Sequence, residues 1–432
     1  MRIDRLGDLG GPAEVLRAVS AGAARLGLPA PAALTGDWFG SRAVIAPSVD
    51  VVPVDPGRAF CLPAGPARAT GTGPGQEAGS PIGGGWVGCL AYPDPGADGA
   101  SNRIPEALGG WTDCVLRLDH DGQWWYESLS GATVPNWILD AVGNATAPGH
   151  WHIDWTAPDQ ASQRDGVLAC LAAITAGEVY QACICTQFTG ALTGSTLDFF
   201  ADAISATRPA RAAYIAGTWG AVASLSPELF LRRRGDTVDS SPIKGTLPLR
   251  ADPAALRTSA KDVAENIMIV DLVRNDLGRV AVTGTVRVPE LLAIAPAPGV
   301  WHLVSTVSAE VPVDVPMYDV LDATFPPASV TGTPKHRARE LLSQWEPHRR
   351  GIYCGTVGLA SPAAGTELNV AIRTVEFDAA GNAVLGVGGG ITADSDPDAE
   401  WQECLHKAAA TVGLRCTAGN AERVSAPTVP VR

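Results

Sequence analysis

The chain has 432 residues and carries 32 Lys and Arg against 45 Asp and Glu, a formal net charge of −13. Hydrophobic residues make up 46% of the chain and charged residues 18%, so it can bury a large core, and wholesale disorder is excluded. The acidic balance disfavours non-specific binding to nucleic acid or to an anionic membrane, but it leaves room for a small anion held by local cations or a metal.

The cysteines and the apolar segments indicate the compartment. Nine scattered cysteines form no C-x-x-C pair, which argues against a disulfide framework and against a zinc site. The first residues lack the apolar segment of a secretory signal, and the long charge-free stretches contain Gln, Thr, Ser and Gly. We therefore expect a cytoplasmic protein without membrane spans.

The first 150 residues form the first expected region, with a helix, a strand after a glycine turn, a hairpin, a Gly- and Pro-rich mobile loop and a final linker. The helix is expected over residues 13–26, the mobile loop over 62–82 and the strand over 83–92. The hairpin is expected over 115–118 and 123–127, and the linker over 142–162.

Residues 151–418 form the second expected region, the catalytic core, and residues 419–432 are expected to be a flexible tail. Helices are predicted over 164–176, 197–206, 259–277, 318–323, 335–344 and 399–413. Strands are predicted over 181–188, within 212–225, and over 230–233, 237–240, 356–360, 367–377 and 383–386.

Two pairs of carboxylates are the first candidate site. Asp262 and Glu265 are three residues apart on one predicted helix, and Glu400 and Glu403 on another, so each pair lies on one helix face. If the helices converge, the carboxylates need a cation, and an oxygen-only ligand set favours Mg²⁺. The competing interpretation is two solvated helix faces.

A lysine and a glutamate are the second candidate site. Lys244, in the segment PIKGT, can act as a nucleophile where desolvation favours its neutral amine. Glu228, near the end of a neighbouring strand, is its candidate acid/base partner. Each could instead be an ordinary surface residue.

A glycine run and three single residues complete the set. Gly388, Gly389 and Gly390 let backbone amides approach an anion, although the spacing is not that of a dinucleotide fingerprint. Arg373, in an apolar predicted strand, needs a partner such as a ligand carboxylate. His302 and Tyr353 are further candidates, though a lone histidine is more often structural.

In their order along the chain, these segments resemble the chorismate-utilising enzymes. The resemblance covers roughly residues 160–415 and is weaker at 83–92. It rests on PIKGT (242–246), AENIMIVDLVRNDLGR (264–279), HLVS (302–305), SVTGTPK (329–335), RGIYCG (350–355), NVAIR (369–373) and GGGITADSDPDAEWQECLHK (388–407).

The resemblance implies a fold and a ligand set. The fold is an α/β (α+β) sandwich of two facing, mostly antiparallel β-sheets flanked by helices, in which the N-terminal region completes the sandwich and can hold a tryptophan-type ligand. Mg²⁺ bound by Asp262, Glu265, Glu400 and Glu403 chelates the ring carboxylate of chorismate, with the shorter Asp262 reaching through water. The substrate contacts implied are Gly245, Thr246, His302, Tyr353, Arg373, Gly388, Gly389, Gly390 and Lys407.

Two residues indicate the branch within the family. Gln181 stands where isochorismate and salicylate synthases carry a lysine that activates water, so water addition is disfavoured. Lys244 stands where anthranilate synthase component I usually carries Ala, and a lysine there is the mark of aminodeoxychorismate synthase component I. Anthranilate synthesis, and a non-catalytic subunit with the same fold, remain as alternatives.

That branch implies a mechanism and a partner. Lys244 attacks ring carbon two while Glu228 protonates the departing hydroxyl, and ammonia then displaces the lysine to give 4-amino-4-deoxychorismate, a precursor of para-aminobenzoate and folate. The sequence shows no glutaminase region, so the resemblance implies that a separate glutamine amidotransferase subunit supplies ammonia.

Overall fold

The structure is a computed structural model that describes residues 1–62, 81–94 and 102–418. The loop expected over 62–82 falls almost wholly outside these residues, and so does the tail expected over 419–432. Within the described part of the chain, no helix combines the length and the apolar character needed to cross a bilayer.

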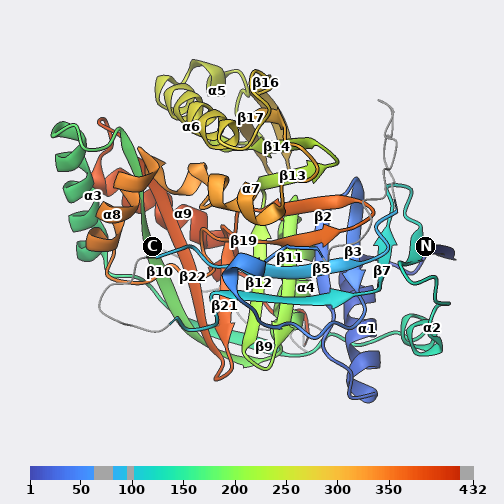
Figure 1. Cartoon of the computed structure of the whole chain (residues 1–432). Helices are drawn as coiled ribbons and strands as arrows, with labels where there is room; N and C mark the ends of the chain where they lie inside the picture. Colours follow the sequence, from blue (N-terminus) through green and yellow to red (C-terminus); the bar gives the residue numbers. More distant parts are fainter. Residues whose placement is uncertain (63–80, 95–101, 419–432) are drawn as a thin grey trace.

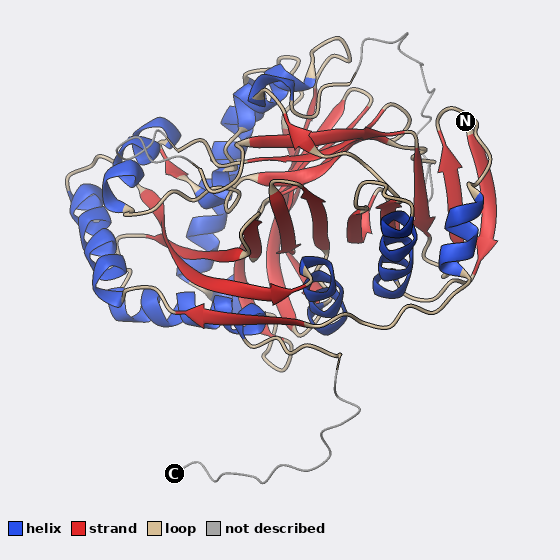
Figure 2. Ribbon diagram, turned by 90° about the horizontal axis from the view of Figure 1, so that it is seen from below, coloured by secondary structure: helices blue, strands red, loops and turns tan. Residues whose placement is uncertain are grey.

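Two antiparallel sheets face each other, with helices outside them (Figures 1 and 2). This confirms the expected sandwich. The larger sheet has the order β1 (Arg2–Gly7), β8 (Trp124–Ser128), β7 (Cys114–Leu118), β3 (Ser41–Ala46), β2 (Ala32–Trp38), β11 (Arg211–Gly217), β12 (Gly220–Ser226), β21 (Thr374–Asp378), β22 (Asn382–Ile391), β10 (Gln181–Gly194), β18 (Gly332–Thr333), with β9 (Trp151–Thr156) also paired to β10.

The smaller sheet has the order β15 (Ile243–Pro248), β17 (Val300–Glu310), β14 (Thr237–Ser241), β13 (Leu229–Arg234), β20 (Gly365–Asn369), β19 (Thr356–Ser361), β5 (Gly85–Leu90), β6 (Ala107–Thr112), β4 (Val52–Pro53), with β16 (Arg287–Ala297) also paired to β17. The N-terminal strands extend both sheets, because β2 pairs with β11 in one sheet and β5 pairs with β19 in the other.

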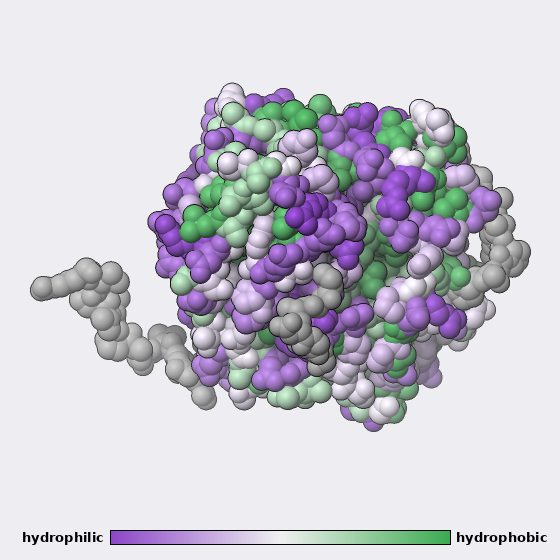
Figure 3. Space-filling model, turned by 60° about the vertical axis from the view of Figure 1, so that its left-hand side comes forward, coloured by the Kyte–Doolittle hydropathy of each residue, from purple (hydrophilic) through white to green (hydrophobic). Residues whose placement is uncertain are grey.

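The helices are α1 (Pro12–Arg25), α2 (Asn136–Val142), α3 (Gln160–Thr175), α4 (Thr196–Thr207), α5 (Ala255–Thr258), α6 (Ala260–Gly278), α7 (Met317–Thr324), α8 (Lys335–Trp345) and α9 (Pro397–Val412), with short 3₁₀ turns η1 (Pro56–Arg58) and η2 (Ala328–Val330). Helices α1, α4 and α9 pack on the larger sheet, and α6 and α7 pack on the smaller one. The face drawn in Figure 3 carries both hydrophilic and hydrophobic residues.

The central strands are buried on both faces, and β11 shows why. Ala212 and Tyr214 point into the core beneath the helices, whereas Ala213 and Ile215 point into the core between the sheets. Successive strand residues point to opposite faces, so the side chains of one short apolar strand pack into two hydrophobic cores.

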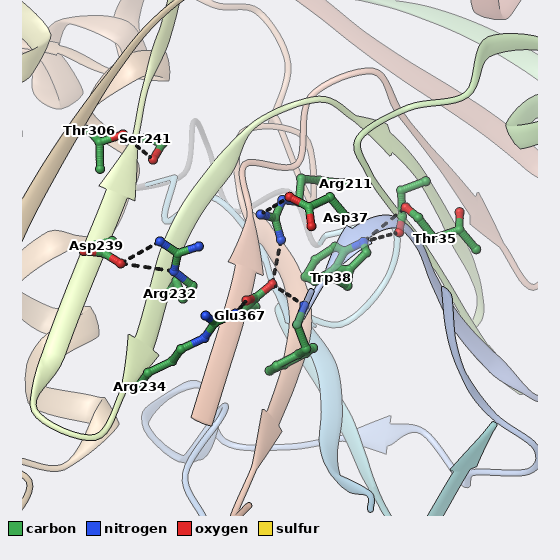
Figure 4. A network of polar contacts seen from close by, with 12 residues as sticks. Thr35, Asp37, Trp38, Arg211, Arg232, Arg234, Asp239, Ser241, Thr306 and Glu367 are labelled. Carbon is green, nitrogen blue, oxygen red and sulfur yellow. Dashed lines mark hydrogen bonds and ion pairs between the residues drawn. The ribbon is translucent and has the colours of Figure 1, made fainter. Parts of the chain in front are cut away.

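A buried ion-pair network ties the two sheets together (Figure 4). Glu367 on β20, with 1% of its side chain exposed, accepts from Arg211 of β11 at 2.6 Å and from Arg234 of β13 at 3.0 Å. The backbone N–H of Phe39 also donates to it, at 2.9 Å. Removing this carboxylate would leave arginines without their buried partner.

Most predicted elements are confirmed, and two are wrong. The expected linker over 142–162 contains strand β9 and the start of α3 at Gln160. The single strand expected over 367–377 is two strands in different sheets, because β20 ends at Asn369 and β21 begins at Thr374. The glycine strand continues to Ile391, beyond its predicted end at residue 386.

Candidate active site

Lys244 lies where the two sheets and helix α6 meet. It is the second residue of β15 in the smaller sheet, and its Nζ lies 3.8 Å from Oε2 of Glu265 on α6, with 12% of the lysine side chain exposed. A Cβ placed on Gly390 of β22, in the larger sheet, would lie 3.4 Å from both of these atoms. The structure therefore brings the predicted nucleophile, one predicted metal ligand and the glycine strand together.

The glycine after Lys244 is required by the backbone and by packing. Gly245 has a φ of +87°, in the left-handed region that favours glycine. A Cβ there would also lie 3.1 Å from Cβ and Cγ of Asp262. Gly245 thus lets β15 turn tightly against the first turn of α6 and places Asp262 beside the lysine strand.

Glu228 lies in the connection between β12 and β13, where the chain passes from one sheet to the other, and it is 3% exposed. Its Oε1 accepts a long hydrogen bond, 3.5 Å, from the backbone N–H of Ile243, next to Lys244. Burial raises the pKa of Glu228 to about 7, although the Ser329 hydroxyl and the charge of Lys244 act in the opposite direction. A carboxyl group with this pKa can both donate and accept a proton near neutral pH.

Arg373 lies near this carboxyl group and also near His302. Arg373 lies in the connection between β20 and β21, where the chain again passes from one sheet to the other. It has a φ of +51° and does not lie within a strand as predicted. His302 on β17 pairs its Nδ1 with the Thr246 hydroxyl at 2.9 Å. Burial, and then the charge of Arg373, lower the pKa of His302 to about 4. The imidazole is therefore neutral at pH 7 and suits substrate contact better than proton transfer.

The glycines of β22 have no side chains, and neighbouring groups therefore approach the backbone of this strand closely. A Cβ on Gly388 would lie 2.7 Å from Sγ of Cys185, and a Cβ on Gly386 would collide with the ring of Tyr353. Gly388 to Gly390 pair with β10 along one edge. Strand β21 pairs with β22 only as far as Leu385, so alternate amides beyond it face an edge without a strand among the described residues.

The carboxylates on α9 join the same cluster. A Cβ on Gly389 would lie 3.0 Å from Oε2 of Glu400 and 3.9 Å from Oε1 of Glu403. Lys407 Nζ donates to the Gly388 carbonyl at 2.9 Å and pairs with Glu403 at 2.7 Å. Although its partial burial alone would raise the pKa of Glu403, Lys407 holds this pKa below its usual value.

Lysines neutralise the carboxylates in this arrangement. Lys261 pairs with Glu400 at 3.0 Å, and Lys244 approaches Glu265. Burial raises the pKa of Glu265 in spite of the charge of Lys244. Among the residues the structure describes, no three His, Cys, Asp or Glu side chains already stand as a finished metal site.

The donor set nevertheless fits a divalent cation. Oε2 of Glu400 is buried without a hydrogen-bond partner, and Glu265 and Glu403 lie around the adjacent glycines. Several partly buried carboxylates around one unpartnered oxygen match the all-oxygen ligands of Mg²⁺. Oε1 of the same carboxylate accepts from Lys261 at 3.0 Å and from the Ser395 hydroxyl at 2.7 Å.

Three further residues belong to the cluster. Ser329, within the SVTGTPK segment, is a hydrogen-bond partner of Glu228, and Lys261 precedes Asp262 on α6. Gln181 on β10 is 3% exposed, and its Oε1 has no partner. A Cβ on Gly390 would lie 3.6 Å from that oxygen. Lys261 could have been predicted from the sequence, because it stands next to the predicted metal ligand Asp262. A single serine such as Ser329 gives no comparable sequence signal.

Comparison with known proteins decides the family. A family model described as chorismate binding enzyme matches residues 67–413. The chain belongs to the chorismate binding enzyme family.

Two relatives with similar sequences carry different names. Aminodeoxychorismate synthase component 1 of Klebsiella aerogenes is 38% identical over 328 residues, 72% of this chain and 71% of the relative. Anthranilate synthase component 1 of Arthrobacter globiformis is 38% identical over 350 residues, 77% of this chain and 63% of the relative. The crystal structure of anthranilate synthase component I from Streptococcus pneumoniae TIGR4 shares the fold, with a TM-score of 0.68 at 24% identity over 78% of this chain and 82% of that one.

Proposed function

We propose that this chain aminates chorismate to 4-amino-4-deoxychorismate, using ammonia and a transient bond to Lys244. One observation carries the proposal: an amine and a carboxyl group with a pKa near 7 flank the same buried cluster, contributed by both sheets. The relative from Klebsiella aerogenes, named aminodeoxychorismate synthase component 1, supports the same reaction.

The first half of the proposed reaction joins Lys244 to the ring. Lys244 reacts as the neutral amine: its Nζ forms a bond to ring carbon two, the two ring double bonds shift, and the hydroxyl group leaves carbon four. Glu228 donates the proton with which this hydroxyl departs as water. Burial keeps a large fraction of Glu228 protonated near neutral pH, as this step requires.

The second half releases Lys244. Ammonia attacks carbon four, the double bonds return to their original positions, and the bond between carbon two and Nζ breaks. Glu228, now a carboxylate, takes a proton from the incoming nitrogen. Overall, one ammonia enters and one water leaves, and the enzyme is regenerated.

The remaining residues bind and orient the substrate. Arg373, Tyr353 and the amides of the glycine strand would hold the enolpyruvyl carboxylate, and neutral His302 with Thr246 would contact the ring side. Glu265, Glu400 and Glu403 would hold Mg²⁺, with Asp262 reaching it through water. When bound, the cation chelates the ring carboxylate and makes the ring more electrophilic.

Ammonia would come from a separate glutamine amidotransferase subunit. The designation "component 1" of the Klebsiella aerogenes relative is consistent with such a second subunit. The product would feed para-aminobenzoate and folate synthesis. Free ammonium at high concentration should replace the subunit in a test with the purified chain.

Product analysis tests this function. The chain is incubated with chorismate, Mg²⁺ and ammonium chloride, and the products are separated by chromatography with mass detection. Formation of 4-amino-4-deoxychorismate supports the proposal. Anthranilate, recognised by its blue fluorescence, would favour the second candidate, which the Arthrobacter globiformis relative suggests. Chorismate left intact would favour a non-catalytic subunit.

A further inference from the structure

An open groove of about 680 Å³ lies between α6, the end of α7 and the start of α8. Its lining mixes apolar side chains such as Leu272 and Phe325 with charged ones such as Arg279 and Asp322. None of the predicted catalytic, metal-binding or substrate-binding residues lines it. The proposed reaction therefore leaves this groove without a role.

A small internal cavity lies on the other side of the same helix. It has a volume of about 10 Å³, room for one water-sized molecule. Glu228 and Ser329 are among its polar lining residues, and Val273 of α6 and Val370 contribute apolar walls. Lys244 does not line this cavity, so Glu228 borders a space that the predicted nucleophile does not.

Asp276 of α6 is the residue that lines both spaces. Its Oδ2 accepts a hydrogen bond of 2.6 Å from Nζ of Lys335, which also donates to the Thr324 carbonyl at 2.9 Å. Only 7% of the aspartate side chain and 15% of the lysine side chain are exposed. This ion pair and Thr324 form the wall between the outer groove and the inner cavity.

We infer that ammonia reaches the reaction centre from the outer groove, past the Asp276–Lys335 pair and through the inner cavity to Glu228. This inference rests on the proposed function and adds the route of its second substrate. Both ends of the route are on the molecule: an open groove outside, and inside the carboxylate that takes a proton from the attacking nitrogen.

Ammonia fits this route by size and by chemistry. A cavity that admits a single water-sized molecule admits ammonia and excludes chorismate. The Asp276 carboxylate and the Thr324 carbonyl can accept hydrogen bonds from a passing ammonia, and the apolar walls beyond favour the neutral molecule over ammonium. Ammonia and chorismate would therefore approach the reacting carbon from different sides.

A cavity-filling substitution tests the route. Val273→Ile adds one methylene to the cavity wall, whereas Val270→Ile makes the same change one turn earlier on α6, where the residue is similarly buried but lines neither space. We expect Val273→Ile to raise the KM for ammonia about tenfold while the KM for chorismate changes less than about twofold. Val270→Ile should leave both constants within about twofold of the wild type.

A wider cavity should give the opposite effect. Methylamine is one methyl group larger than ammonia, so the wild-type chain should use it poorly, and Val273→Ala should improve its use relative to ammonia by about tenfold. Unchanged KM for ammonia in Val273→Ile, or no gain with methylamine in Val273→Ala, would overturn the route. If neither variant folds, equal use of methylamine and ammonia by the wild type overturns it.

These outcomes are separable from failure of the proposed function. If the wild-type chain consumes no chorismate in the presence of ammonium, the proposed function fails. If it does consume chorismate but the cavity variants behave like the wild type, the function stands and the route fails.

Discussion

Glu228→Gln should make the protein more stable at alkaline pH while it abolishes the reaction. Burial raises the pKa of Glu228 from 4.5 to about 7 in the folded chain. The folded state therefore favours the neutral carboxyl group, and the stability that Glu228 contributes is complete below pH 4.5 and is lost as the pH rises through about 7. A shift of this size corresponds to about 3 kcal/mol lost by pH 8.

Glutamine has nearly the same shape and does not ionise, so the variant avoids this loss. Urea or thermal unfolding of both proteins, without ligands or metal, should give similar free energies of unfolding near pH 4.5. At pH 8 the variant should be more stable by about 3 kcal/mol. All other titrating groups are shared, so the difference between the two proteins isolates Glu228. If the difference in free energy of unfolding between the two proteins is the same at about pH 4.5 and about pH 8, burial does not raise the pKa of Glu228 as inferred.

Three further predictions concern the scaffold and the cation. Glu367→Ala should lower the free energy of unfolding by about 3–5 kcal/mol in thermal melts, because the buried Arg211 loses its buried partner. Glu310→Ala, with an exposed side chain, should cost less than about 1 kcal/mol. Gly245→Ala should reduce both stability and chorismate turnover; Gly235→Ala also has a positive φ but open space around it, and it should leave turnover near the wild-type value. Removing divalent cations with a chelator should abolish turnover by the wild-type chain, and added Mg²⁺ should restore it; turnover that survives chelation would contradict a cation held by the carboxylates.

Helices and tight hairpins could be read from the sequence because their signals are local. The predicted helix over 259–277 differs from α6 by one residue at each end, since its serine N-cap and apolar spacing lie within the helix itself. The hairpin of β13 and β14 closes over Gly235, again a local signal.

The wrong secondary-structure predictions occurred where contacts with distant parts of the chain determine the conformation. β9 pairs with the far end of β10, so nothing local distinguishes it from a linker. The apolar run from Glu367 to Phe377 reads as one strand, but a left-handed Arg373 lets the chain change sheets. No property of the run itself reports which sheet each half joins.

The candidate site was predictable by residue type but not by arrangement. Residue spacing paired Glu400 with Glu403, and the family resemblance selected Lys244, but only the structure shows that Glu265 and Lys244 lie together at Gly390. The pairing of Lys261 with Glu400 joins residues far apart in the chain, so it could not be predicted from the sequence.

The bond between Lys244 and the ring is the central claim, and mass spectrometry tests it most directly. The chain has only four lysines, at positions 244, 261, 335 and 407, so peptide mapping can assign an adduct without ambiguity. After incubation with chorismate and Mg²⁺ but no ammonia, the wild type should carry one adduct of the mass of chorismate less one water, on Lys244, and ammonium should remove it. Lys244→Ala should carry none and should not turn over chorismate. An adduct on another residue, or ammonia-dependent turnover by Lys244→Ala at the wild-type rate, would contradict the account.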